Sequence, residues 1–262
     1  MGKLKVMLAV HVYGDVCGET VKCLVSELQV DRQDLHWDVV FPASDALVSR
    51  LRSEVVTRAI QGGHDVLVWL DHDMVWTPGD LAGLVKHCAE VQGAVGALIP
   101  FRAEWMFGRG FAWRPLPGIR GAEARLGADR LVPAEKVGGG FVAFWVPALT
   151  RMVEELEKSP DPALKVSRCR SAVEGFFWDV CRPVAVPYGP GEDLLNYLSE
   201  DWALLMRLQA CGVKVFVWTK PLIRHIGSKQ YSAADALGMV GAADVIEDHL
   251  RRTGAGALWT QG

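Results

Sequence analysis

The sequence predicts an α/β protein in which a mostly parallel sheet carries helices on both faces. Three observations predict it. Short apolar runs alternate with amphipathic stretches through the first hundred residues, the run at 66–70 is apolar at every position, and a helix-start signal follows that run. A strand that is apolar throughout is typical of the centre of a parallel sheet, where helices cover both faces. The β-α-β order favours a doubly wound sheet with right-handed crossovers.

Each element follows from its local pattern. The predicted strands are 6–10, 37–41, 66–70, 94–99, 141–146 and 213–218. The predicted helices are 20–28, 46–60, 81–91, 148–158, 202–210 and about 232–252. Before the third helix, Thr77 is the expected N-cap, with Pro78 in the first turn and the Asp80 carboxylate at the third position. Gly212 is expected to end the fifth helix, and Ser232 opens the last one as part of a capping box.

The 262 residues suit one structural domain with an inserted segment. Residues 1–100 form the expected nucleotide-binding half, and 137–231 the expected acceptor and catalytic half. Between them, 101–136 is rich in Gly, Pro, Arg and aromatic residues without a sustained period, which predicts an inserted loop or hairpin lobe on the acceptor side. A second irregular stretch with several prolines covers 159–197, and 232–262 forms the expected C-terminal helix and tail.

Composition excludes several classes of protein. The net charge of −3 predicts neither wholesale nucleic-acid binding nor a membrane-surface role. The longest uncharged run, 137–150, is too short for a membrane span, and we expect no signal peptide. The six cysteines are scattered without a C-x-x-C pair, which argues against a zinc ribbon or a thioredoxin-like site. This cysteine usage suits a reducing cytoplasm, where we expect the protein.

Two carboxylates follow the buried central strand. Asp71 stands where the apolar run at 66–70 ends, and Asp73 comes two residues later. Ligands of open parallel sheets bind at the carboxyl ends of the strands, and in extended chain residues i and i+2 point to the same side. The two carboxylates are therefore expected to share a hard divalent cation. The alternative is that one aspartate caps a turn and the other is solvated.

Later motifs extend the pattern. In order along the chain they are Leu70-Asp71-His72-Asp73-Met74, Val137-Gly138-Gly139-Gly140-Phe141, Glu200-Asp201-Trp202-Ala203-Leu204 and His225-Ile226-Gly227. Their order and spacing resemble the GT-A class of glycosyltransferases, and within it the bacterial and phage proteins related to the large inverting family. The resemblance covers roughly residues 4–230 and implies a GT-A-like, Rossmann-like fold. It also implies a donor nucleotide sugar, a UDP-sugar being the first choice.

The resemblance implies the roles of the motif residues. Asp73 would be the principal metal ligand, Asp71 would touch the metal or the donor ribose, and His225 would be the remaining ligand. Imidazole mixed with carboxylates suits Mn²⁺ somewhat better than Mg²⁺. Asp201, or its neighbour Glu200, resembles the catalytic base that takes the proton of the acceptor hydroxyl. The alternatives are a structural histidine and a pair of acids that complement the helix dipole behind an N-cap serine.

Contacts to the donor are expected from residues that follow the first strands and from the later loops. Arg52 resembles an arginine that these proteins carry about twenty residues before D-x-D. It would contact the donor or brace the aspartates, and a surface salt bridge is the alternative. The glycines let the backbone approach the donor sugar. The expected donor-binding residues are His11, Tyr13, Ser44, Arg52, Asp71, His72, Gly139, Gly140 and Lys229.

The inserted segment suggests the acceptor. Six Arg and one Lys against four acids give residues 101–136 a charge of +3 within a chain of net charge −3. Aromatic rings among cations suit a glycan, a lipid-linked sugar or a hydroxymethylated DNA base in a phage-like system. The alternative is a small aromatic core with solvated arginines. The expected acceptor-binding residues are Trp105, Arg109, Trp113 and Trp202.

Other functions are weaker interpretations. A nucleotidyltransferase of similar fold would carry a Gly-rich phosphate loop after the first strand, and residues 10–16 contain one glycine and no basic residue. A dehydrogenase would show G-x-G-x-x-G after a strand, which this sequence lacks. A non-catalytic nucleotide-sugar-binding module would not need the acids and the histidine of the motifs. The pattern leaves the sugar, the acceptor, the stereochemical outcome and the oligomeric state open.

Overall fold

A computed structural model describes residues 2–30, 33–42, 47–100, 111–116, 127–171, 175–187, 195–226 and 230–231. Its centre is an eight-stranded sheet with the order β2-β1-β3-β8-β5-β13-β7-β6. The strands are β1 (Leu4–His11), β2 (Leu35–Val40), β3 (Val66–Asp71), β5 (Ala94–Ala97), β6 (Trp113–Pro115), β7 (Leu131–Val137), β8 (Phe141–Trp145) and β13 (Val215–Trp218).

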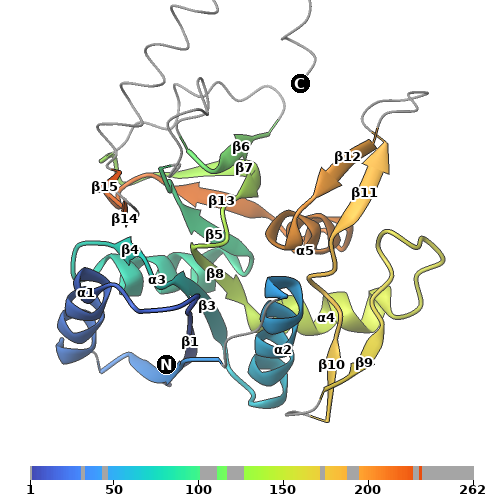
Figure 1. The fold of residues 1–262 in the computed structure, drawn as a ribbon, viewed down its shortest axis with the longest axis horizontal. Helices are drawn as coiled ribbons and strands as arrows, with labels where there is room; N and C mark the ends of the chain where they lie inside the picture. The colour runs from blue at the N-terminus through green and yellow to red at the C-terminus, as the bar shows by residue number, and fades with distance from the viewer. Residues whose placement is uncertain are drawn as a thin grey trace, which may run out of the picture.

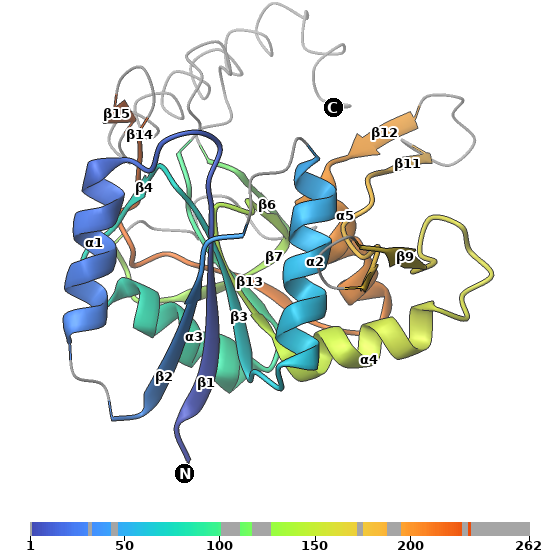
Figure 2. The same cartoon turned by 60° about the horizontal axis from the view of Figure 1, so that its bottom comes forward.

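Helices cover both faces of this sheet (Figures 1 and 2). They are α1 (Gly18–Gln29), α2 (Val48–Gln61), α3 (Asp80–Val91), α4 (Val146–Leu156) and α5 (Glu200–Ala210). One buried cluster joins apolar residues of α2, α4 and α5 to one face, and a second joins α1 and α3 to the other. Buried on both sides, β3 is apolar from Val66 to Leu70, as the sequence predicts.

The sheet is mixed, with β8 as a reversed strand in its middle. β8 pairs antiparallel with both β3 and β5, and β7 pairs antiparallel with β13 and with β6. The other six strands run in one direction. The prediction of an α/β fold with a mostly parallel sheet and helices on both faces is confirmed, and the architecture is consistent with a GT-A-like fold. The strand that interrupts the parallel order in the middle of the sheet is β8.

The predicted start of the third helix differs from the structure. The third helix begins at Asp80 with Gly79 as N-cap in a left-handed conformation, so Thr77 is not the cap. The Asp80 carboxylate instead accepts a hydrogen bond from the Thr77 backbone amide at 3.2 Å. Amides at this helix start are bound by the fully buried carboxylate of Glu27, which accepts from Gly79 at 2.6 Å and from Ala82 at 3.2 Å. This long-range cap replaces the local one that the sequence suggested.

Segments predicted as irregular contain short strands. Within 101–136, β6 and most of β7 extend the central sheet. Within 159–197, two antiparallel pairs form: β9 (Arg168–Arg170) with β10 (Phe176–Trp178), and β11 (Val184–Pro187) with β12 (Leu195–Leu198). Strands of three or four residues show too little alternation to be read from sequence. The predicted helix at 232–252 lies outside the described residues.

A small sheet stands at the edge of the fold. It consists of β15 (Gln230–Tyr231), β14 (Arg224–Ile226) and β4 (Met74–Val75), in that order. β4 begins three residues after the end of β3, so the D-x-D turn runs directly into this sheet. None of the helices in the described residues is both long enough and apolar enough to cross a bilayer.

Candidate active site

The candidate site lies at the carboxyl ends of β1 and β3. His11 and Asp71, the last residues of these strands, are paired in register. After Asp71 the chain turns through His72 and Asp73 into β4. The turn docks on the segment after β1, because the His72 amide donates to the His11 carbonyl at 3.0 Å and the Cys17 amide donates to the His72 carbonyl at 3.1 Å.

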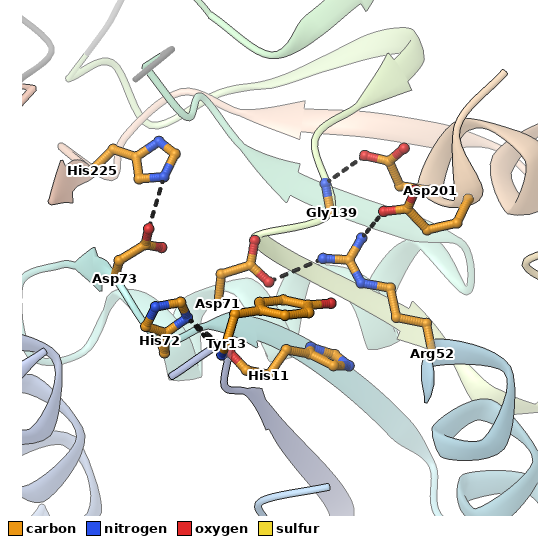
Figure 3. Close-up of polar contacts among 10 residues, drawn as sticks. His11, Tyr13, Arg52, Asp71, His72, Asp73, Gly139, Asp201 and His225 are labelled. Carbon is orange, nitrogen blue, oxygen red and sulfur yellow. Dashed lines mark hydrogen bonds and ion pairs between the residues drawn. The ribbon is translucent and has the colours of Figure 1, made fainter. Parts of the chain in front are cut away.

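Because of this turn, the two aspartates of the motif face different partners (Figure 3). The Asp71 carboxylate points toward Arg52, whereas that of Asp73 points toward His225. Each carboxylate therefore has a charged partner of its own at this edge of the sheet. Among the residues that the structure describes, no group of three or more metal-binding side chains forms.

Arg52 on α2 is the centre of the larger charge cluster. Its Nη2 donates to Asp71 Oδ1 at 3.0 Å and its Nη1 donates to Glu200 Oε1 at 2.9 Å. Its side chain is only 4% exposed, and the guanidinium lies 4.8 Å from the centroid of the Trp69 ring. The alternative of a surface salt bridge is wrong, and Arg52 braces the first aspartate of the motif.

Burial and charge oppose each other in this cluster. Burial alone would lower the pKa of Arg52, but the carboxylates of Asp71, Glu200 and Asp201 outweigh it and raise that pKa. Burial raises the pKa of Glu200 above its usual value, although the Arg52 charge acts against the shift. We therefore treat Arg52 as permanently charged and Glu200 as its paired but partly desolvated partner.

Asp201 stands beside this cluster at the start of α5. Its Oδ2 accepts a hydrogen bond from the Gly139 amide at 3.0 Å, and its Oδ1 accepts from the Trp202 amide at 2.8 Å and from the Ser199 hydroxyl. Ser199 is the N-cap residue, as expected, but its hydroxyl bonds the carboxylate rather than a backbone amide. A carboxylate has about four acceptor positions, so Oδ2 keeps room for one more donor.

The glycine-rich turn at 138–140 lies against the side chains of Arg52, Asp71 and Asp201. A Cβ at Gly139 would stand 2.2 Å from Arg52 Nη1 and 3.1 Å from Asp201 Cβ. A Cβ at Gly140 would stand 2.8 Å from Asp71 Oδ2. A Cβ at either position would displace these charged side chains, so glycine lets the backbone lie directly against them. The expectation that these glycines approach a donor sugar is a separate proposal.

Asp73 and His225 form the second charged pair. Asp73 Oδ2 lies 3.3 Å from His225 Nε2, and the Ile226 amide donates to the Asp73 carbonyl at 2.8 Å. β14 carries His225 to this place by pairing antiparallel with β4, His225 opposite Met74. The other ring nitrogen, Nδ1, lies 3.0 Å from the Pro100 carbonyl oxygen.

The hydrogen bond to Pro100 decides the tautomer of His225. A carbonyl oxygen can only accept, so Nδ1 carries the proton and donates it. In the neutral ring, the lone pair of Nε2 then faces the Asp73 carboxylate, which is repulsive unless a proton or a cation lies between them. One imidazole and one carboxylate fit a divalent transition-metal ion, and the backbone bond to Nδ1 is the usual outer support of a metal-binding histidine.

His72 and Tyr13 lie on the outer side of the D-x-D turn. The His72 Nδ1 is 3.3 Å from the His11 carbonyl oxygen and 3.5 Å from the Tyr13 amide. The two rings make an edge contact at 6.1 Å, and Tyr13 is 42% exposed. Tyr13 can therefore meet a ligand at this edge.

His11 lies inside the protein instead. Its ring is fully buried against the edge of Trp69, and among the described residues neither ring nitrogen has a hydrogen-bond partner. Burial, and secondly the charge of Arg52, lower the pKa of His11 well below its usual value. In this conformation His11 cannot touch a donor, so a contribution to binding would act through its neighbours.

The buried neutral ring predicts a pH effect on stability. His11 is neutral in the folded state but binds a proton in the unfolded state below about 6.5, so acidification should favour unfolding. Below pH 6.5, the free energy of unfolding should fall by up to about 1.4 kcal/mol per pH unit more in the wild type than in His11→Phe. Urea unfolding at pH 7.5 and 5.5 measures this, with the exposed His36→Gln as control. Equal losses in wild type and His11→Phe would contradict the assignment.

The predicted acceptor residues separate into three groups. Trp202, on α5 next to Asp201, is partly buried and lies under two cations, with Lys136 Nζ 4.5 Å and Arg114 Cζ 5.6 Å from its ring centroid. Trp113 packs against the apolar cluster on the α2 side of the sheet. Trp105 and Arg109, together with the predicted donor residues Ser44 and Lys229, lie outside the described residues.

Sequence reasoning missed two participants. Lys136 and Arg114 were counted only in the charge of the insertion, yet both reach the residue next to Asp201. Alternation along 131–137 is the signal that could have placed Lys136 on an inward face, because Val132, Ala134 and Lys136 are all buried there.

Comparisons with known proteins concern the fold. No protein-family model matches the sequence, and no curated protein matches it. The structure of A197 from STIV aligns with a TM-score of 0.50 at 14% identity, over 87% of this chain and 89% of A197. At that identity, the likeness supports a shared fold and nothing about activity.

Two further solved structures align less well. GalNAc-T7 with UDP, GalNAc and Mn²⁺ gives a TM-score of 0.48 at 11% identity, over 87% of this chain and 44% of that one. The mannosyltransferase PcManGT from Pyrobaculum calidifontis, in complex with GDP-Man and Mn²⁺, gives 0.35 at 18% identity, over 57% and 47% of the two chains. These TM-scores are too low to support a conclusion about this chain. The predicted relation to the bacterial and phage inverting enzymes stays a prediction.

Proposed function

We propose that this chain is a metal-dependent glycosyltransferase that moves a sugar from a nucleotide-sugar donor to an acceptor hydroxyl. The observation that carries the proposal is the Asp73–His225 pair, in which the imidazole Nε2 lies 3.3 Å from a carboxylate oxygen at the carboxyl edge of the sheet while Nδ1 is held by the Pro100 carbonyl. The charged cluster of Arg52, Asp71 and Glu200, with Asp201 beside it, stands at the same edge and supplies candidates for the remaining roles (Figure 3).

Asp73 and His225 would hold the divalent cation, with Asp71 close enough in sequence to touch the cation or the donor ribose. A nitrogen and oxygen ligand set suits Mn²⁺ better than Mg²⁺. Such an ion offsets the charge that develops on a departing nucleoside diphosphate. Arg52 holds the Asp71 carboxylate in one orientation through the 3.0 Å bond, so that part of the site is rigid before a donor arrives.

Asp201 is the base that we favour over Glu200. The Glu200 carboxylate is engaged by Arg52, whereas Asp201 is oriented by two backbone amides and keeps one acceptor position on Oδ2. That position would take the proton of the acceptor hydroxyl as the hydroxyl attacks the anomeric carbon. If the reaction retains configuration, the same carboxylate would bind the acceptor or the sugar hydroxyls.

The Asp201→Asn variant tests this role. The turnover number should fall by at least about a hundredfold with little change in donor affinity, because the amide cannot accept a proton. Steady-state transfer rates and calorimetric titration of the nucleoside diphosphate measure the two quantities. The single amide oxygen can accept from only one of the Gly139 and Trp202 amides, which bond different oxygens of the carboxylate, so urea unfolding of the variant is measured alongside. An unchanged turnover number would move the role of base to Glu200.

For the donor, a UDP-sugar is the first choice to test, and for the acceptor a glycan or a lipid-linked sugar. No described residue favours the modified DNA base. The cytoplasmic location likewise stays a prediction.

A nucleotide-sugar panel tests the proposed function itself. The purified chain is screened by thermal shift with each nucleotide sugar and Mn²⁺, and the best donor is then assayed for release of its nucleoside diphosphate. A donor present at 100 times its dissociation constant should stabilise the protein by roughly 2.7 kcal/mol. Release of the nucleoside diphosphate should stop on addition of EDTA and return with Mn²⁺. Full activity in EDTA, or no stabilisation by any donor, would overturn the proposal.

A further inference from the structure

Two cations face each other across the β6–β7 pair. Arg114 and Lys136 are cross-strand partners in the antiparallel register, next to a register shift at Arg114/Pro115. Like charges directly opposite each other destabilise a strand pair. Burial, and secondly the charge of Arg114, lower the pKa of Lys136, which is the same conflict seen from the buried residue. The arrangement costs stability, which favours a functional role for the two cations.

Both cations converge on the ring of Trp202. Lys136 Nζ lies 4.5 Å and Arg114 Cζ 5.6 Å from its centroid, within the range of a cation–π contact. The ring offsets part of the repulsion, and Glu135 offsets more, with its Oε1 3.6 Å from a terminal nitrogen of each cation. Glu135 lies against both cations, and the charge of Asp201 also acts on Lys136, so the exposed positive group of the patch is the Arg114 guanidinium.

The patch is open to a ligand from the side of Arg114. The Arg114 side chain is 38% exposed and that of Glu135 32%, whereas Lys136 lies beneath at 7%. Arginine presents a planar fork of donors that matches a phosphate or a carboxylate. The Lys136 ammonium group is shielded from water, which would otherwise screen its charge. It therefore adds to the positive potential at Arg114.

The position of the patch connects it to the acceptor rather than to the donor diphosphate. Trp202 is the neighbour of Asp201, and its amide donates to the Asp201 carboxylate. Lys136 lies three residues before Gly139, and the Gly139 amide donates to the other oxygen of the Asp201 carboxylate. The Asp73–His225 pair, where the diphosphate is proposed to bind, stands on the opposite side of Asp71 from Asp201 (Figure 3).

We propose that Arg114, supported by Lys136 and Trp202, binds a negatively charged group of the acceptor, a phosphate or a carboxylate. The inference rests on the proposed function, because it names the acceptor class of that same site. An anionic group held by Arg114 would anchor the acceptor beside Asp201 while its hydroxyl meets Oδ2. The Arg114 guanidinium would thereby select negatively charged acceptors over neutral ones.

Matched probes test the charge preference. With the nucleoside diphosphate and Mn²⁺ saturating the donor site, glucose 6-phosphate, glucuronate and glucose are titrated by calorimetry into wild type, Arg114→Gln and Lys136→Met. Arg151→Gln, an exposed arginine on α4, is the control. At least one charged probe should bind wild type about tenfold or more tightly than glucose, as expected for one charge-assisted contact. The preference between the phosphate and the carboxylate arms identifies the anionic group.

The variants test whether Arg114 and Lys136 cause the preference for charged probes. Arg114→Gln should lose the tenfold advantage of the charged probe and Arg151→Gln should keep it. If the buried Lys136→Met fails to fold, Arg114→Gln still decides. Equal binding of charged and neutral probes, no binding of a charged probe, or an advantage that survives in Arg114→Gln would each overturn the inference. Wild-type cleavage of the donor without acceptor tests the proposed function separately, so failure of one is distinct from failure of the other.

Discussion

Replacing Asp73 with alanine should lower the rate of donor cleavage by about a thousandfold while the fold remains intact. The variant removes the carboxylate of the proposed metal pair and leaves His225 as a single ligand. A bound cation contributes several kcal/mol of charge stabilisation, and each 1.36 kcal/mol is a factor of ten in rate. Release of the nucleoside diphosphate at saturating Mn²⁺ measures the loss, and circular dichroism with urea unfolding checks the fold.

A second readout separates metal binding from general damage at this site. Mn²⁺ titration followed by electron paramagnetic resonance should show weaker binding in Asp73→Ala and in His225→Phe, and unchanged binding in Glu154→Ala, an exposed acid on α4. If Asp73→Ala binds Mn²⁺ as the wild type does and cleaves the donor at the wild-type rate, the metal assignment fails.

The scaffold of the site was largely predictable from the sequence, because its signals are local. The apolar run at 66–70 specified a buried strand, and the polar residues after it pointed to the edge that carries the candidate site. The direction of β8 was not predictable in the same way. Phe141–Trp145 is buried on both faces, and an apolar run looks alike whether the strand runs parallel or antiparallel to its neighbours.

The partners within the site were less predictable, because they depend on contacts between distant segments. The bond from Arg52 to Glu200 joins residues 148 positions apart, and no local pattern pairs them. The place of His225 depends on β14 and β4, which have three and two residues and carry no periodic signal. The motif order predicted which residue types gather, while the turn at 72–73 decides that Asp71 and Asp73 take different partners.

Arg52 connects the elements that carry the proposed chemistry. From α2 it reaches Asp71 at the end of β3 and Glu200 at the start of α5, and a Cβ at Gly139 would collide with its Nη1. These segments hold the first motif aspartate, the proposed base and the glycine-rich turn. A buried cation between two carboxylates therefore sets the distance between the proposed donor and acceptor sides. Its loss should affect stability and activity together.

The Arg52→Met variant should lower the free energy of unfolding by about 3–5 kcal/mol, because it leaves two carboxylates without their buried counter-charge. Urea unfolding at pH 7 measures the change. Arg58→Met, an exposed arginine on the same helix, is the matched control and should stay within about 0.5 kcal/mol of the wild type. A loss in Arg52→Met no larger than in Arg58→Met would contradict the role of Arg52.

A double variant distinguishes uncompensated charge from lost packing. If the cost comes from carboxylates left without a cation, then Glu200→Gln should recover part of the stability in the Arg52→Met background, since the neutral amide needs no counter-ion. In the wild-type background, the same substitution should instead cost stability, because it removes a charged partner at 2.9 Å from Arg52. An effect of Glu200→Gln on stability that changes sign between the two backgrounds shows that Arg52 and Glu200 are energetically coupled. Additive losses would mean that Arg52 acts mainly by packing over Trp69, and that its charge does not hold the two sides of the site together.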